Sequence, residues 1–216
     1  MSKDRIGAAV RAATIGFVLA AFLTGGSAPD PQPEKDAGKF VLGVIYAGMA
    51  LFSDQRMDPA ERDARFSQLV AENLDTQRIA RFVLGRHWDT ASEREREAFM
   101  RVYPSYLARI FETRIGQFGG AMVSVSSVKA TGGETRVTTV LEFLGPRPSA
   151  ASVSEMEIGW LVRATPDGFK IEDIDYQGIS LKLEQRSDVT TIVAQVGETV
   201  EGLVRYILDS LNVPAL

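Results

Sequence analysis

The chain has 216 residues, a formal net charge of -4 and an ordinary globular composition, with 45% hydrophobic and 24% charged residues. Such an acidic chain lacks the positive field that a phosphate backbone requires, so we expect no nucleic-acid partner. The sequence holds no cysteine and one histidine, His87. This excludes disulfides, thiol nucleophiles, a lipid anchor on an N-terminal cysteine, and metal sites built from cysteine or histidine clusters.

The N-terminus resembles a secretory signal. Its first eleven residues carry three basic side chains, and an uncharged run over residues 12–23 (AATIGFVLAAFL) precedes four small residues. At 1.5 Å per residue this run reaches roughly 18 Å, short of the ~30 Å hydrocarbon core of a bilayer. An uncleaved short anchor is the alternative. We predict a signal peptide over 1–28, with the cleavage point open, and a single domain over 29–216.

In the next part of the chain, apolar residues recur at the spacing of an α-helix. A polar leader at 30–36 precedes apolar residues that predict a helix over 38–52. An Asp-Pro pair at 58–59 predicts the start of a second helix, because aspartate caps a helix and proline suits its first turn. A further helical segment around 79–83 ends at Gly85.

The clearest helix follows Thr90-Ala-Ser-Glu93, which we interpret as a capping box. From Phe99 as far as Ile115, apolar residues recur at the helical period and charged residues occupy the other face. Pro104 is expected to kink this helix, and a Gly-Gly pair at 119–120 to end it.

After residue 120 the apolar period changes from 3.6 to 2, which predicts β-strands. Turn signals at 132–133, 145–148 and 166–168 separate four strands. The fourth covers 169–176, and we expect 179–183 to extend it past a glycine. The residues expected on one apolar face of the first three strands are Val123, Val125, Val137, Thr139, Leu141, Phe143, Met156, Ile158, Trp160 and Val162.

Two helical patterns, at 189–196 and 200–211, finish the chain. Helices come first, then strands, then helices, with no β-α-β alternation. This order predicts an α+β fold: an antiparallel meander of about four strands with helices packed on one face.

Two segments resemble the MlaC/toluene-tolerance family. Residues 80–88 (ARFVLGRHW) and 91–99 (ASEREREAF) are similar to the family's LG..W..AS..QR..F stretch, and residues 169–181 (FKIEDIDYQGISL) to its WKVYDV..EGVSL strand. The likeness covers roughly residues 62–211 in the same order. The departures are Phe169 in place of tryptophan, Gln177 in place of glutamate, and Pro104 inside the long helix.

The resemblance implies a soluble periplasmic component of an ABC-type lipid transport system, with lipid as cargo, no cofactor and no catalysis. Such a protein carries phospholipid between an outer-membrane lipoprotein complex and an inner-membrane transporter that has an MCE-domain subunit. A hopanoid or another polycyclic lipid is the alternative cargo, because some relatives accompany hopanoid synthesis. The direction of transport stays open, and a shuttle is most simply a monomer.

A carrier must hide acyl chains, so we expect an apolar lipid cavity between the sheet and its helices, near the upper end of the usual 300–1,000 Å³. The alternative is that the same residues form ordinary packed core. The residues expected to wall this cavity are Tyr103, Leu107, Phe111, Val137, Thr139, Leu141, Met156, Ile158, Trp160 and Ile179.

Polar candidates are few. Arg147 is a candidate neighbour of the lipid phosphate, with a solvated loop arginine as the alternative. The carboxylates of Asp173 and Asp175 are suited to acid–base work or a cation, but no partner motif accompanies them, and we interpret Asp173 as a structural hydrogen-bonding group. A sheet-and-helix cavity enzyme acting on a small hydrophobic substrate is the second alternative, and it requires an inward His/Asp pair. A purely structural module with a filled core is the third.

Overall fold

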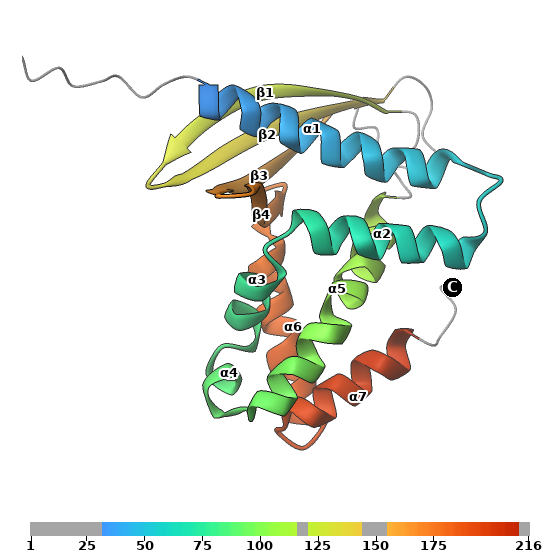
Figure 1. Ribbon diagram of the computed structural model, residues 1–216, viewed down its shortest axis with the longest axis vertical. Coiled ribbons are helices and arrows are strands. Elements are labelled where there is room, and N and C mark those ends of the chain that lie inside the picture. Colours follow the sequence, from blue (N-terminus) through green and yellow to red (C-terminus); the bar gives the residue numbers. More distant parts are fainter. Residues whose placement is uncertain (1–31, 116–120, 144–154, 212–216) are drawn as a thin grey trace, which may run out of the picture. The chain divides into compact units, whose positions relative to one another are not determined.

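The computed structural model describes residues 32–115, 121–143 and 155–211 (Figure 1). The chain divides into two units, Met1–Asp30 and Pro31–Leu216, and every described residue belongs to the second. The predicted signal segment over 1–28, the Gly-Gly pair at 119–120 and Arg147 lie outside the described residues.

Helices come first and last along the described chain, with the strands between them (Figure 1). The helices are α1 (Gln32–Ser53), α2 (Pro59–Asn73), α3 (Thr76–Leu84), α4 (Arg86–Thr90), α5 (Glu93–Ile115), α6 (Leu181–Gln195) and α7 (Val200–Leu211). The strands are β1 (Ala121–Thr131), β2 (Glu134–Phe143), β3 (Glu155–Thr165), β4 (Gly168–Tyr176) and β5 (Ile179–Ser180).

The strands form one sheet in the order β1-β2-β3-β4-β5, and every neighbouring pair is antiparallel. The α+β class and the meander are therefore confirmed, with a short fifth strand added. The expected extension of the fourth strand over 179–183 is wrong, because residues 179–180 form a separate strand antiparallel to β4 and α6 begins at Leu181. The chain reverses through Gln177 and Gly178, which both have positive φ, and the Ser180 side chain then caps α6 by accepting a hydrogen bond from the Leu183 amide at 3.1 Å.

Two helix starts and one proline inside a helix can be compared with the sequence predictions. The Asp58 carboxylate accepts hydrogen bonds from the amides of Ala60 and Glu61, so this start is confirmed. The first helix begins at Gln32, inside the predicted polar leader, because charged residues are compatible with a first helical turn. Pro104 lies inside α5, which continues on both sides of it.

The capping box lies two residues later than predicted. The Ser92 amide donates to Glu95 Oε2 at 2.8 Å, and the Glu95 amide donates back to Ser92 Oγ at 3.3 Å. Thr90 is still part of α4, and the amide of the next residue bonds to the His87 carbonyl, so Thr90 does not adopt the extended conformation of an N-cap.

Helix α1 packs against β1 and β2, and α2 packs against both α1 and α5 (Figure 1). The Tyr46 hydroxyl of α1 donates to the Val123 carbonyl at 3.0 Å. Helices α5 and α7 share a close-packed core in which the rings of Phe99 and Tyr103 stack at 4.7 Å and are fully buried, together with Leu203. The contact between α5 and α7 is thus filled with side chains, and the cavity described next lies nearer the sheet.

Candidate functional site

An apolar cavity lies among α1, α2, α5 and the sheet. Its volume is about 880 Å³ when the solvent on its open side is included. The residues that line it are Val44, Ile45, Gly48, Met49, Phe66, Leu69, Val70, Leu74, Phe111, Leu141, Ile158, Trp160, Ile174, Tyr176 and Leu181. Among the described residues of this lining, Tyr176 alone carries an ionisable side chain.

The α1 wall explains an unusual property of that helix. Within the described part of the chain, the segment Glu34–Ser53 is long and apolar enough to cross a membrane by length and composition, and only 22% of its most apolar stretch is buried. The core helix of a soluble protein or a signal segment can have the same length and apolar composition. Here Val44, Ile45 and Met49 are half-buried because they face the cavity, where no close-packed side chains cover them.

The sheet wall is centred on Trp160 of β3. Its indole Nε1–H donates to the hydroxyl of Thr139 on β2 at 2.9 Å, and that hydroxyl donates to the Ile158 carbonyl at 3.4 Å. Thr139 is fully buried and Trp160 is nearly so. The bond satisfies the indole and fixes the ring, which leaves an apolar surface toward the cavity.

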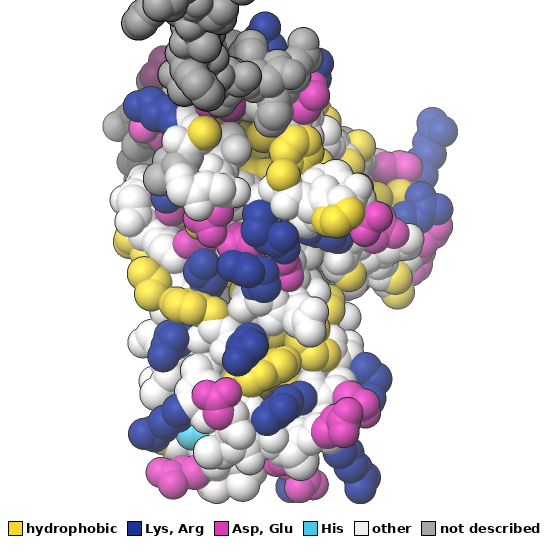
Figure 2. Space-filling model, turned by 60° about the vertical axis from the view of Figure 1, so that its left-hand side comes forward, with side chains coloured by type: hydrophobic (Ala, Val, Ile, Leu, Met, Phe, Trp, Pro, Cys, Tyr) yellow, Lys and Arg dark blue, Asp and Glu magenta, His cyan; other side chains and the backbone are white. Residues whose placement is uncertain are grey.

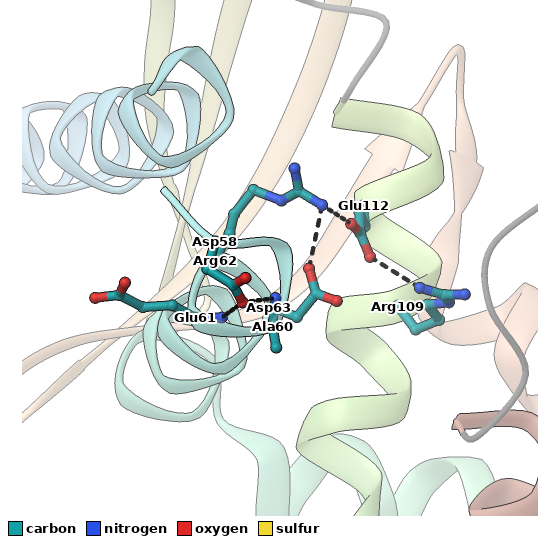
Figure 3. A network of polar contacts seen from close by, with 7 residues as sticks. All are labelled: Asp58, Ala60, Glu61, Arg62, Asp63, Arg109 and Glu112. Atoms are coloured by element: carbon teal, nitrogen blue, oxygen red, sulfur yellow. Dashed lines mark hydrogen bonds and ion pairs between the residues drawn. The ribbon is translucent and has the colours of Figure 1, made fainter. Parts of the chain in front are cut away.

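The α2 wall is held against α5 by charge. Arg62 on α2 pairs with Glu112 on α5 at 3.2 Å, and Glu112 also pairs with Arg109 at 3.4 Å (Figure 3). The Arg62 guanidinium lies 5.4 Å from the centre of the Phe52 ring on α1. This network ties together three helices that line the cavity.

The structure places four of the ten predicted wall residues in the lining: Phe111, Leu141, Ile158 and Trp160. Thr139 supports Trp160 from behind. Four are buried outside this lining: Leu107, which lines a smaller neighbouring pocket, and Tyr103, Val137 and Met156.

Ile179 is misplaced by the sequence interpretation, because it is 61% exposed. It belongs to a two-residue strand at the edge of the sheet, with no further strand beyond it to cover its side chain. The residue of this segment that does reach the cavity is Leu181, in the first turn of α6.

The missed residues come mainly from the two N-terminal helices. They are Val44, Ile45, Gly48, Met49, Phe66, Leu69, Val70, Leu74, Ile174, Tyr176 and Leu181. The sequence of α1 held one signal that could have identified these residues. Its apolar residues and two glycines cover more of the helix surface than a single buried face requires.

The polar candidates have structural roles. Asp173 accepts hydrogen bonds from Ser180 Oγ at 2.6 Å and from the Lys182 amide at 3.0 Å, so it stabilises the turn into α6 as expected. Asp175 pairs with Arg136 on β2. No set of three histidine, aspartate or glutamate side chains that could hold a metal ion lies among the described residues. Burial raises the pKa of Tyr103, whose hydroxyl has no hydrogen-bond partner in the described part of the chain, so this phenol stays neutral.

The family model for the MlaC protein matches residues 49–208. The chain belongs to the MlaC family. MlaC proteins are periplasmic phospholipid-binding carriers and not enzymes, so the predicted family and the assignment to lipid carriage are confirmed. The match includes α2 to α6 completely, and with them most of the cavity lining.

A solved structure has the same fold as this MlaC chain: the phospholipid-binding protein from Ralstonia solanacearum in complex with a phospholipid. The two are 19% identical with a TM-score of 0.64, and the alignment covers 82% of this chain and 97% of that one. At this identity the likeness shows the fold alone. No curated protein matches the chain.

Proposed function

We propose that the cavity described above holds the acyl chains of a phospholipid, which this MlaC protein carries through the periplasm. The observation that supports this most directly is the partly open cavity, about 880 Å³ with its open side included, whose described lining residues are all apolar except for Tyr176. The lining resembles hydrocarbon in its chemistry. The similar Ralstonia solanacearum protein is described as binding a phospholipid, which supports the same cargo here.

Such a cavity suits a carrier that must also release its cargo. Each methylene moved from water to an apolar site gains about 0.8 kcal/mol, so one sixteen-carbon chain represents on the order of 11 kcal/mol relative to water. A bilayer already shields the chain, so transfer between bilayer and cavity is close to neutral. The cavity therefore protects lipid in water without holding it too tightly to return it to a membrane.

We also propose how the protein reaches the periplasm and which membrane complexes it meets there. An N-terminal signal peptide over 1–28 exports the protein, and 29–216 form the lipid-binding domain. An outer-membrane lipoprotein complex and an inner-membrane transporter with an MCE-domain subunit are the expected partners, through family membership. A hopanoid fits the same apolar lining and is the second candidate cargo.

Mass spectrometry of organic extracts from the purified protein tests the cargo. Bound phospholipid is the expected result, and a hopanoid identifies the second candidate. The extraction is repeated after delipidation and incubation with liposomes of defined composition. A small polar metabolite, or no bound molecule after this reloading, contradicts the proposal.

A matched pair of variants tests the site. Leu69→Glu on α2 places a carboxylate in the lining, whereas Leu208→Glu on α7 changes a leucine that is 45% exposed and lies outside it. We expect the first variant to lose co-purifying lipid and the second to keep it. Because a charge in the lining can also unfold the protein, a phospholipid with a photoreactive acyl chain provides a test on the unaltered protein. It is expected to label α1, α2 and β3, and labelling confined to other segments contradicts the assignment.

A further inference from the structure

A second, smaller pocket lies between the cavity and the protein surface. It shares Leu74, Phe111, Ile174 and Leu181 with the apolar cavity. On its other side it shares Ile79, Glu172 and Lys182 with an open groove of about 640 Å³, open side included. The three spaces thus form a series from the apolar interior to an exposed groove between α3 and α6.

This groove is basic. Its lining includes Arg78 and Arg81 from α3 and Lys182 from α6, around the ring of Phe82. The Lys182 ammonium lies 5.0 Å from the centre of that ring, and the Arg186 guanidinium lies 4.9 Å from it on the next turn of α6. Figure 2 shows a face of the molecule on which Lys and Arg side chains gather around apolar surface.

Two of these cations form no close ion pair with a described carboxylate. Among the described residues, no carboxylate lies within ion-pairing distance of Arg81 or Lys182. The whole chain carries a net charge of -4, so this positive groove runs against the overall charge. Like charges held together on an acidic protein are favourable when an anion binds between them.

We propose that this groove binds the phosphate of the cargo phospholipid while its acyl chains occupy the apolar cavity. The inference rests on the proposed function and adds to it a site for the headgroup. Arg81 and Lys182 supply the unpaired charge. Lys182 also forms part of the wall between the groove and the smaller pocket, so movement of its flexible side chain opens the way for an acyl chain.

Arg78 is positioned to assist them. Its Nε pairs with Glu172 at 2.8 Å, which leaves the two terminal nitrogens of the guanidinium to donate to phosphate oxygens. Glu172 is buried and also pairs with Arg163, so it is a fixed support for Arg78.

The carboxylates near the groove oppose an anion only weakly. Glu172 is already neutralised by two arginines. The charges of Lys182 and Arg78 act to lower the pKa of Glu134, but burial first, and then a hydrogen bond and charge repulsion from Glu172, raise that pKa overall, which favours the protonated carboxyl group.

Lipid uptake by the delipidated full domain tests the site. One set of vesicles contains phosphatidylglycerol, and the other contains diacylglycerol with the same acyl chains and no phosphate. The variant is Arg81→Glu/Lys182→Glu. Its control, Arg101→Glu/Lys129→Glu, changes the net charge equally at two exposed cations outside the groove that have no ion pair among the described residues.

We expect the groove variant to take up phosphatidylglycerol at least about tenfold less than the wild type, since the loss of one hydrogen bond between charged groups already weakens binding by about that factor. Its uptake of diacylglycerol and both uptakes by the control should equal those of the wild type. Undiminished phosphatidylglycerol uptake by the groove variant overturns the headgroup site but leaves the cavity intact. A wild type that takes up neither lipid overturns the proposed function itself.

Two further measurements separate other occupants of the groove. Phosphorus NMR with inorganic phosphate shows whether a free anion binds there. Phosphate binding that the groove variant abolishes, with lipid uptake unchanged, assigns the groove to free phosphate and overturns the proposal. Sedimentation with the same vesicles reports docking on a membrane surface. If the variant loses vesicle binding but takes up both lipids equally well once bound, the groove contacts the membrane surface, which also overturns the proposal.

Discussion

Gly48 offers a direct test of whether the interior near α1 is empty. This residue lies in the middle of α1 and lines the cavity. A Cβ atom added there meets Phe66 at 3.6 Å and Leu69 at 3.7 Å, both ordinary van der Waals contacts. We therefore predict that Gly48→Leu is accommodated, with its side chain inside the cavity.

The expected magnitudes follow from the position. Replacing glycine in a helix interior with leucine gains somewhat under about 1 kcal/mol. Burying the new side chain in an empty space adds roughly 1–2 kcal/mol more in the lipid-free protein. The four side-chain carbons displace a similar number of cargo methylenes, each worth about 0.8 kcal/mol, so lipid retention should fall roughly a hundredfold.

Gly43 provides the control. It lies in the same helix, but no atom lies within 4 Å of a Cβ added there. Gly43→Leu should be stabilised only by the higher helix propensity of leucine, and it should retain lipid as well as the wild type does. Thermal unfolding of both delipidated variants, with mass spectrometry of lipid reloaded from vesicles, compares the two positions.

A loss of stability in Gly48→Leu would contradict the prediction that this interior is empty. In a close-packed interior an inserted leucine costs typically 1–3 kcal/mol, so Gly48→Leu would then unfold at a lower temperature than Gly43→Leu. If Gly48→Leu is stable and retains lipid as well as the wild type, the cavity exists but is not where the cargo binds.

Three further outcomes test individual contacts. Thr139→Val should cost about 1–3 kcal/mol, measured by chemical unfolding, because it leaves the buried Trp160 N–H unpaired, and Trp160→Phe in the same chain should recover most of that loss. Hydrogen bonds from Ser92 lower the pKa of Glu95, so the stabilisation is present above the unfolded pKa and lost in acid. Glu95→Gln should therefore be less stable than the wild type at pH 7, and the difference should disappear as the pH falls through the lowered pKa of Glu95. Burial raises the pKa of Glu134, so the ionised group destabilises the fold. Glu134→Gln should be more stable than the wild type at pH 7, and this difference should also vanish on acidification.

Local signals predicted much of the fold. The Asp58 cap, the apolar stripe of α5 and the alternation in β2 and β3 each depend on neighbouring residues alone, and the structure confirms them. The capping box was misplaced because two overlapping segments both match the same motif. Thr90 and Ser92 both begin an S/T-x-x-E pattern, and only the end of α4 decides between them.

The site was harder to predict than the fold. Strand alternation identifies the inward face, which is why Leu141, Ile158 and Trp160 were found. It does not say how far along a strand the empty space extends, and Val137 on the same face is packed core. The contribution of α1 depends on how this helix lies across the sheet, a tertiary property that its periodicity does not contain.

The cavity and the basic groove have different consequences for selectivity. Apolar walls bind any acyl chain about equally and give almost no preference over a bilayer, because the chain is shielded in both places. Selection among lipids must then come from groups that differ between lipids, and these are found at the polar end of the molecule. Under the proposal above, two cations that form no close ion pair with a described carboxylate, beside the half-buried ring of Phe82, provide such a contact where the headgroup remains in water. In this arrangement the cavity determines that lipid is carried, and the groove determines which lipid is carried.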